Sequence, residues 1–148
     1  MLDCVILGDS IAVGTHRAKP ECVAYAKGGI NSWQFNKNYT GEFFSNVVII
    51  SLGSNDHSGV KTRKELEALR SRVVAKSRVY WILPGGVHPR NNKPVSEIQA
   101  DVKAVAEKYG DIVLPITSFA KEVIEGQPVT IHPSGSGYKD IANKVNLF

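Results

Sequence analysis

The chain of 148 residues is long enough to form one domain with its own hydrophobic core, since 43% of the residues are apolar. Its net charge of +4 comes from lysines and arginines spread along the chain, which is typical of solvated helix faces and disfavours nucleic-acid binding. No apolar run approaches the ~18 residues of a membrane span, and no basic leader precedes the first apolar run. We therefore expect one domain over residues 1–148 with no nucleic-acid or membrane partner. We expect it to be cytoplasmic where it is synthesised, and its later delivery elsewhere stays open.

Five short apolar runs rich in β-branched residues predict five strands. Each run is too short for a stable helix and too continuous for a strand with one exposed face, so buried parallel strands fit best. The runs are residues 4–7, 22–26, 47–52, 79–83 and 112–116.

Helical patterns occupy much of the chain between and after these runs. Residues 61–75 and 95–109 carry apolar side chains at helical spacing, and residues 135–145 suit a last helix. In residues 61–75 the apolar side chains that would share one face of the helix are Leu66, Leu69, Val73 and Val74. Residues 33–44 are aromatic and weakly periodic, which we interpret as a short helix and a loop.

Strands that alternate with helices predict βαβ units with right-handed crossovers. The expected fold class is therefore α/β, a flavodoxin-like three-layer α/β/α sandwich. Its centre is a five-stranded parallel sheet with helices on both faces.

The two cysteines, Cys4 and Cys22, each begin an apolar run and do not have metal-ligand spacing. Buried free thiols are the favoured interpretation, although a bridge becomes possible if the two strands are neighbours. The four histidines also lack metal-ligand spacing, so we expect neither a metal nor another cofactor.

Four groups suited to acyl transfer come at strand ends or in the last loop. In parallel sheets ligands bind outside the carboxyl ends of the strands. Ser10, Gly29 and Asn55 each follow a predicted strand, and His132 lies in a proline-containing segment before the last helix. A hydroxyl, a backbone N–H, an amide and an imidazole supply a nucleophile, two oxyanion donors and a base.

Each of these residues also has a purely structural interpretation. Gly-Asp-Ser between a strand and a helix is ordinary turn chemistry, in which either Asp9 or Ser10 caps the helix. Gly29 suits a left-handed turn, Asn55 suits a local Asx-turn, and His132 suits a surface loop. The functional interpretation rests on all four occurring in this order.

The same residues resemble the SGNH hydrolases, also called the GDSL-type esterase and lipase superfamily. Gly8-Asp9-Ser10-Ile11 is similar to the first block of the family, and residues 28–32 are similar to the second. Residues 52–56, Leu-Gly-Ser-Asn-Asp, are similar to the third, and residues 131–138 to the last. The resemblance implies that Ser10 is the nucleophile and His132 the base. It implies an oxyanion hole made by the backbone N–H groups of Ser10 and Gly29 and the side chain of Asn55.

One position departs from the family pattern. The family has an acidic residue three positions before the histidine, whereas this chain has Val129, and the nearest upstream carboxylate is Glu125. We therefore expect either a Ser-His dyad or an atypical third member.

The expected function is a serine esterase that hydrolyses a small-acyl, acetyl-like ester of a small molecule or carbohydrate through an acyl-serine intermediate. The short chain leaves few insertions for an apolar lid. Possible substrate-binding residues are Asp9 and Asp56, with His88 and Arg90 from the polar loop 84–94.

Two other classes of protein compete with this interpretation. One is a catalytically weak or inactive binding module that keeps the same fold. The other is a phosphate or nucleotide binder, which ranks last because no Gly-x-Gly-x-x-Gly follows a strand.

Overall fold

The computed structural model describes residues 3–85, 92–115, 123–124, 127–128, 133 and 135–145. Its main sheet contains β1 (Cys4–Gly8), β2 (Val23–Ala26), β3 (Phe43–Ser51), β4 (Val73–Leu83) and β5 (Ile112–Pro115). All neighbours are parallel, in the order β2-β1-β3-β4-β5. This flavodoxin-like order confirms the predicted fold class. A short antiparallel pair, β6 (Val123–Ile124) and β7 (Gln127–Pro128), was not predicted.

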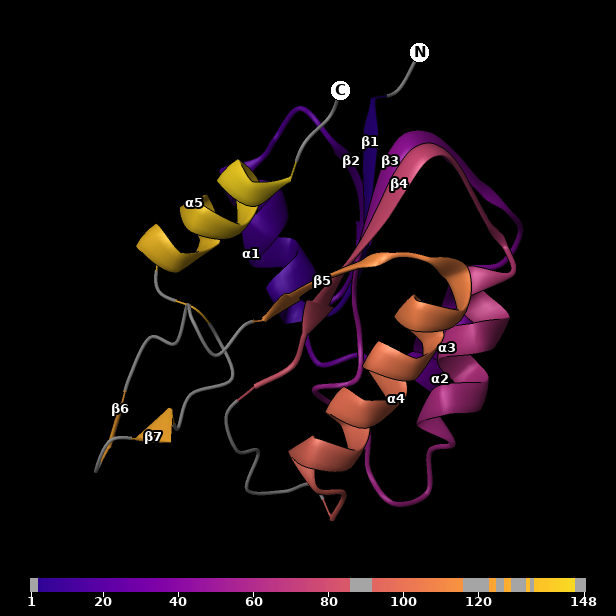
Figure 1. Ribbon diagram of the computed structural model, residues 1–148, viewed down its shortest axis with the longest axis vertical. Coiled ribbons are helices and arrows are strands. Elements are labelled where there is room, and N and C mark those ends of the chain that lie inside the picture. The colour runs from indigo at the N-terminus through magenta and orange to yellow at the C-terminus, as the bar shows by residue number, and fades with distance from the viewer. Residues whose placement is uncertain are drawn as a thin grey trace.

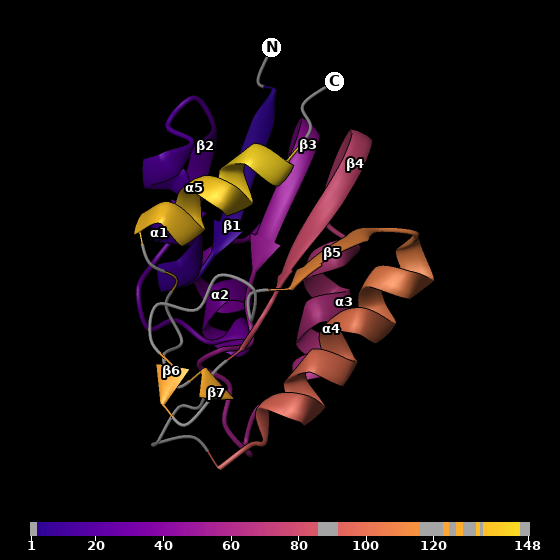
Figure 2. The same cartoon turned by 60° about the vertical axis from the view of Figure 1, so that its left-hand side comes forward.

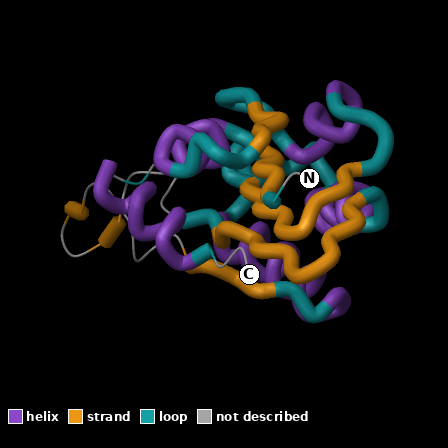
Figure 3. Tube along the Cα trace, turned by 90° about the horizontal axis from the view of Figure 1, so that it is seen from above, coloured by secondary structure: helices purple, strands orange, loops and turns teal. Residues whose placement is uncertain are grey.

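Helices cover both faces of the sheet (Figure 1 and Figure 3). One face packs against α1 (Ser10–Ala18) and α5 (Gly135–Lys144), which lie side by side in Figures 1 and 2. The other face packs against α2 (Ser32–Asn38), α3 (Thr62–Arg70) and α4 (Val95–Tyr109). Alternate strand residues enter the two cores. In β1, Val5 and Leu7 face α2–α4, while Cys4 and Ile6 face α1 and α5. Because both faces are covered, the strands read as continuous apolar runs.

The boundary between α3 and β4 differs from the prediction. The helix ends at Arg70, and Val73 and Val74 begin β4 rather than extending the apolar helix face. They pair with Phe43 and Phe44, so β3 and β4 both extend beyond their apolar runs. Backbone pairing with a neighbouring strand has here overridden the helical spacing of two β-branched residues.

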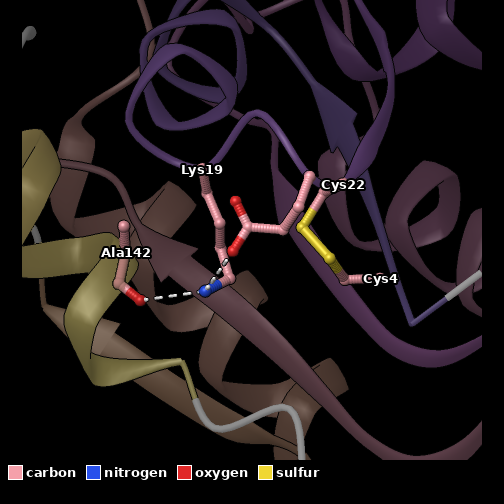
Figure 4. The surroundings of a disulfide bond; sticks show 5 residues. Cys4, Lys19, Cys22 and Ala142 are labelled. Carbon is pink, nitrogen blue, oxygen red and sulfur yellow. Dashed lines mark hydrogen bonds and ion pairs between the residues drawn. A yellow bond between two sulfur atoms is a disulfide. The ribbon is translucent and has the colours of Figure 1, made fainter.

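The two cysteines form a disulfide, which corrects the expectation of free thiols (Figure 4). The parallel register of β1 with β2 places Cys22 beside Cys4, with their Cα atoms 4.8 Å apart. Close to this bond, the Lys19 ammonium donates to the carbonyl of Ala142 in α5 at 3.5 Å (Figure 4). Disulfides persist mainly in oxidising compartments, so this bond does not favour the predicted cytoplasmic location. None of the helices in the described part of the chain is long and apolar enough to cross a bilayer.

Candidate active site

The reversal of strand order places the candidate site between β1 and β3. From β1 the chain crosses to β2 on one side, and it then returns to β3 on the other side. In sheets of this kind, the crevice at the carboxyl ends of those two strands is where ligands bind. Ser10 follows β1 and Asn55 follows β3, so the topology brings both to this crevice.

The turn after β1 is held close against the end of β3. Gly8 has a φ of 144°, and a Cβ at this position would overlap the carbonyl oxygen of Ser51. The backbone N–H of Asp9 donates to that same carbonyl at 3.0 Å. Only glycine fits a positive φ and so close a backbone approach, which explains the residue that precedes Asp9.

The helix cap after β1 is Asp9, not Ser10. The Asp9 side chain accepts from the backbone N–H of Ile11 at 3.0 Å, and Ser10 is the first residue of α1. Ser10 is half-buried. Its hydroxyl therefore stands at the end of the helix where backbone N–H groups and the positive end of the dipole can stabilise a negative charge.

Asp9 is fully buried and incompletely hydrogen-bonded. Its Oδ1 also accepts from the Ser51 hydroxyl at 3.2 Å, while its Oδ2 has no partner among the described residues. Burial raises the pKa of Asp9 to about 7, against the lowering effect of the Ile11 and Ser51 hydrogen bonds. Burial, and secondarily the charge of Asp9, raises the pKa of Tyr138 in α5 to about 12.

The glycine pair after β2 lies beside Ser10. The backbone N–H of Lys27 donates to the carbonyl of Gly8 at 3.0 Å, which joins the turns after β1 and β2. A Cβ built on Gly28 would lie 3.8 Å from the Cβ of Ser10. Gly29 has a φ of 79°, so its predicted left-handed turn is present.

Asn55 ties the turn after β3 to the loop after β2. Its Nδ2 donates to the carbonyl of Ile30 at 3.0 Å, across 25 positions of sequence. This bond is not the local Asx-turn considered above. A side-chain amide carries two N–H bonds, and the contact with Ile30 uses one of them.

Asp56 also joins the loops after β2 and β3, through buried hydrogen bonds. Its Oδ1 accepts from the Ser32 backbone N–H at 2.9 Å, and its Oδ2 accepts from the hydroxyls of Ser32 at 2.6 Å and Thr62 at 2.7 Å. Ser32 and Thr62 are the first residues of α2 and α3. The Lys93 ammonium also donates to the Thr62 hydroxyl at 2.8 Å. Sequence reasoning missed this network, because no local pattern indicates that one carboxylate joins two helix starts.

The predicted substrate-binding residues fall into two groups. Asp9 and Asp56 have no exposed surface, which places both behind the crevice wall. His88 and Arg90 lie outside the described residues, as do His132, Val129 and Glu125.

A small cavity opens beside the glycine pair. It has a volume of about 140 Å³ and is lined by Lys27, Gly28, Gly29, Ile30, Gln34 and Asn38. Because Gly28 approaches the Ser10 side chain, this cavity adjoins the candidate nucleophile.

The chain is similar to solved structures of GDSL-type proteins. It matches a GDSL-like lipase from Bacteroides thetaiotaomicron with a TM-score of 0.65 and 17% identity, over 95% of this chain and 83% of that one. A lipolytic G-D-S-L family protein from Veillonella parvula gives a TM-score of 0.66 and 18% identity, over 97% and 96%. An alpha/beta hydrolase enzyme from the metagenome of Lake Arreo, Spain, gives 0.63 and 15%, over 95% and 91%. No protein-family model and no curated protein sequence matches the chain significantly. At these identities the likeness establishes the fold.

Proposed function

From the premise that this chain has the fold of the GDSL-type SGNH hydrolases, we propose that it is a serine esterase. One observation carries the proposal, namely that hydrogen bonds join the three turns in pairs. The turn after β1 bonds to the end of β3 through Asp9 and to the turn after β2 through Gly8, and the loops after β2 and β3 meet at Asn55. These bonds gather the turns that carry a hydroxyl, a glycine N–H and a neutral amide, which are the groups that acyl transfer needs.

The proposed reaction begins with attack of the Ser10 hydroxyl on the ester carbonyl. The developing oxyanion accepts hydrogen bonds from the backbone N–H groups of Ser10 and Gly29 and from the Asn55 amide. Donors that carry no charge stabilise the tetrahedral intermediate without binding anions indiscriminately. The intermediate expels the alcohol and leaves an acyl group on Ser10, and water then releases the acid and regenerates the serine.

His132 is proposed as the base that takes the Ser10 proton and gives it to the leaving alcohol. Val129 cannot supply the carboxylate that fixes the histidine tautomer in a serine triad. A backbone carbonyl or another acid such as Glu125 would then orient the ring. We expect His132→Ala to abolish turnover.

The proposed substrates carry a short acyl group such as acetyl, on a small-molecule or carbohydrate alcohol. Within residues 1–148 the strands and helices of the fold take up most of the sequence, and the little that these residues leave for a lid or a long acyl tunnel supports this choice.

Turnover of 4-nitrophenyl esters of graded chain length tests the function. We expect acetyl and butyryl esters to react fastest and Ser10→Ala to lose at least about 10³-fold in kcat/KM. Ser96→Ala, an exposed serine at the start of α4, is the matched control and should react like the wild type. A serine-directed phosphonate should label Ser10 alone. A folded protein without Ser10-dependent turnover would instead be a binding module with this fold.

A further inference from the structure

The cavity beside Gly28 and Gly29 is lined by side-chain hydrogen-bond donors that have no acceptor among the described residues. It has two structural differences from an apolar acyl pocket. Three of its six lining residues, Lys27, Gln34 and Asn38, have polar side chains, and none of the six is acidic. A cavity next to a nucleophile normally determines which substrates the enzyme selects.

Lys27 supplies a cation to this cavity. Its ammonium has no ion-pair or hydrogen-bond partner among the described residues, and the side chain is exposed. Its position is nonetheless fixed at the backbone, because the Lys27 N–H donates to Gly8 at 3.0 Å. The ammonium is therefore carried on the turn that lies against Ser10.

The start of α2 limits what Gln34 can offer. The Gln34 Oε1 already accepts from the backbone N–H of Asn31 at 2.9 Å in a capping box, in which Asn31 in turn accepts from the Gln34 N–H. The polar group of Gln34 that the capping box does not use is its N–H₂. Asn38 adds a further amide to the lining, with no side-chain partner among the described residues.

A second groove shows that polar side chains without a nearby acid are not a general property of the cavities on this surface. It lies between α3 and α4, has a volume of about 590 Å³, and contains Lys61, Arg63, Lys64 and Lys93. Three acids, Glu67, Glu97 and Asp101, line it as well, and Arg63 pairs with Asp101 at 3.1 Å. Three of its four positive charges are therefore matched by acids, whereas the one positive charge of the cavity beside Ser10 has no acid in the lining.

We propose that Lys27, with the amides of Gln34 and Asn38, forms a specificity site for a carboxylate carried by the ester substrate. A carboxylate offers only acceptors, which matches an ammonium and two amide donors. This inference rests on the proposed function, since it takes Ser10 as the reacting group. The carboxylate can belong to the acyl part or to the alcohol part of the ester.

Two matched substrate pairs test the proposal. Mono-4-nitrophenyl succinate is compared with 4-nitrophenyl butyrate for the acyl side, and 4-acetoxybenzoate with 4-acetoxybenzamide for the alcohol side. For at least one pair, Lys27→Glu should lower the anionic-to-neutral ratio of kcat/KM by about tenfold, and Lys27→Met by about fivefold, as expected for a partly solvated charge pair. Raising the salt concentration should shrink the difference.

Lys103→Glu is the matched control, because it makes the same charge change on an exposed part of α4. It should leave both ratios at the wild-type value. Equal ratios for wild type and Lys27→Glu in both pairs would overturn the proposal, as would an equal effect of Lys103→Glu.

A binding measurement separates this proposal from the proposed function. In Ser10→Ala, which cannot form an acyl-enzyme, mono-4-nitrophenyl succinate should shift the amide NMR signals of residues 27–30, and Lys27→Glu should abolish the shifts. Shifts without Ser10-dependent turnover in the wild type would refute the esterase and keep the carboxylate site. Turnover of neutral esters, with no NMR shifts and no carboxylate preference, would refute the carboxylate site and keep the esterase.

Discussion

Asp9 and Asp56 are both fully buried, and each is adjacent in sequence to a proposed catalytic residue, yet their surroundings differ. Asp56 accepts three hydrogen bonds, and both of its oxygens have partners. Asp9 accepts from Ile11 and Ser51 on one oxygen only. The other oxygen has no partner within the described chain.

The number and position of donors decide what a buried carboxyl does. Three donors from the starts of α2 and α3 make Asp56 an acceptor that holds two loops together. At Asp9 the donors are too few to offset burial, so its pKa rises to about 7 and it gains a proton in the neutral range. One turn of the proposed site is thus anchored by a fully paired carboxylate, and the other is capped by an acid that titrates.

The largest expected effect is on Asp56. Asp56→Ala leaves the Ser32 N–H and the Ser32 and Thr62 hydroxyls without their acceptor, and each such buried donor costs about 1–3 kcal/mol. We expect a loss of about 3–6 kcal/mol in the free energy of unfolding, measured in urea. Asp56→Asn keeps the shape and one oxygen, so it should lose less. Equal stability of Asp56→Ala and wild type would mean that this network does not hold the loops.

The next effect distinguishes Asn55 from its neighbour Asp56. An oxyanion donor acts mainly in the transition state, so Asn55→Ala should lower kcat by about 10²–10³ while KM changes little. Its stability should fall by about 1 kcal/mol, for the lost bond to Ile30. Kinetics and urea unfolding on the same preparation separate the two roles. A large loss of stability with unchanged kcat per folded molecule would make Asn55 structural only.

The smallest effect concerns the titration of Asp9. Its folded pKa of about 7 lies above the ordinary value of 3.8, so the folded state binds the proton more tightly. The contribution of Asp9 to stability is then complete below pH 3.8 and is lost as the pH rises to about 7.

Asp9→Asn tests this titration, because asparagine caps helices as well as aspartate but does not titrate. Between pH 4 and pH 7 the wild type should lose about 3 kcal/mol relative to Asp9→Asn. Unfolding of both proteins across this range measures the difference. Parallel stability curves would show that Asp9 is already ionised at pH 4 in the folded protein.

Much of the fold and part of the candidate site follow from short segments. Strands buried on both faces must be apolar throughout. The runs beginning at Cys4 and Val47 therefore indicate strands even before their neighbours in the sheet are known. The turn at Gly8 and the helix of residues 95–109 can likewise be predicted from their own short segments. Since ligand-binding residues follow strands in this architecture, Ser10 and Asn55 are indicated as well, and their catalytic roles stay predictions.

The amino-acid sequence by itself determined which segments become strands, which turns follow them and which chemical groups those turns carry. Only the tertiary structure decided which distant residues these segments and groups contact. It placed Val73 in a strand beside Phe43, Cys22 beside Cys4, and Asp56 beneath Ser32, which is 24 positions away. The physical reason is the distance along the chain over which each effect acts. Periodicity and turn preference act within a few residues, whereas strand register and the hydrogen bonds of a buried carboxylate depend on which distant turns the sheet order brings together.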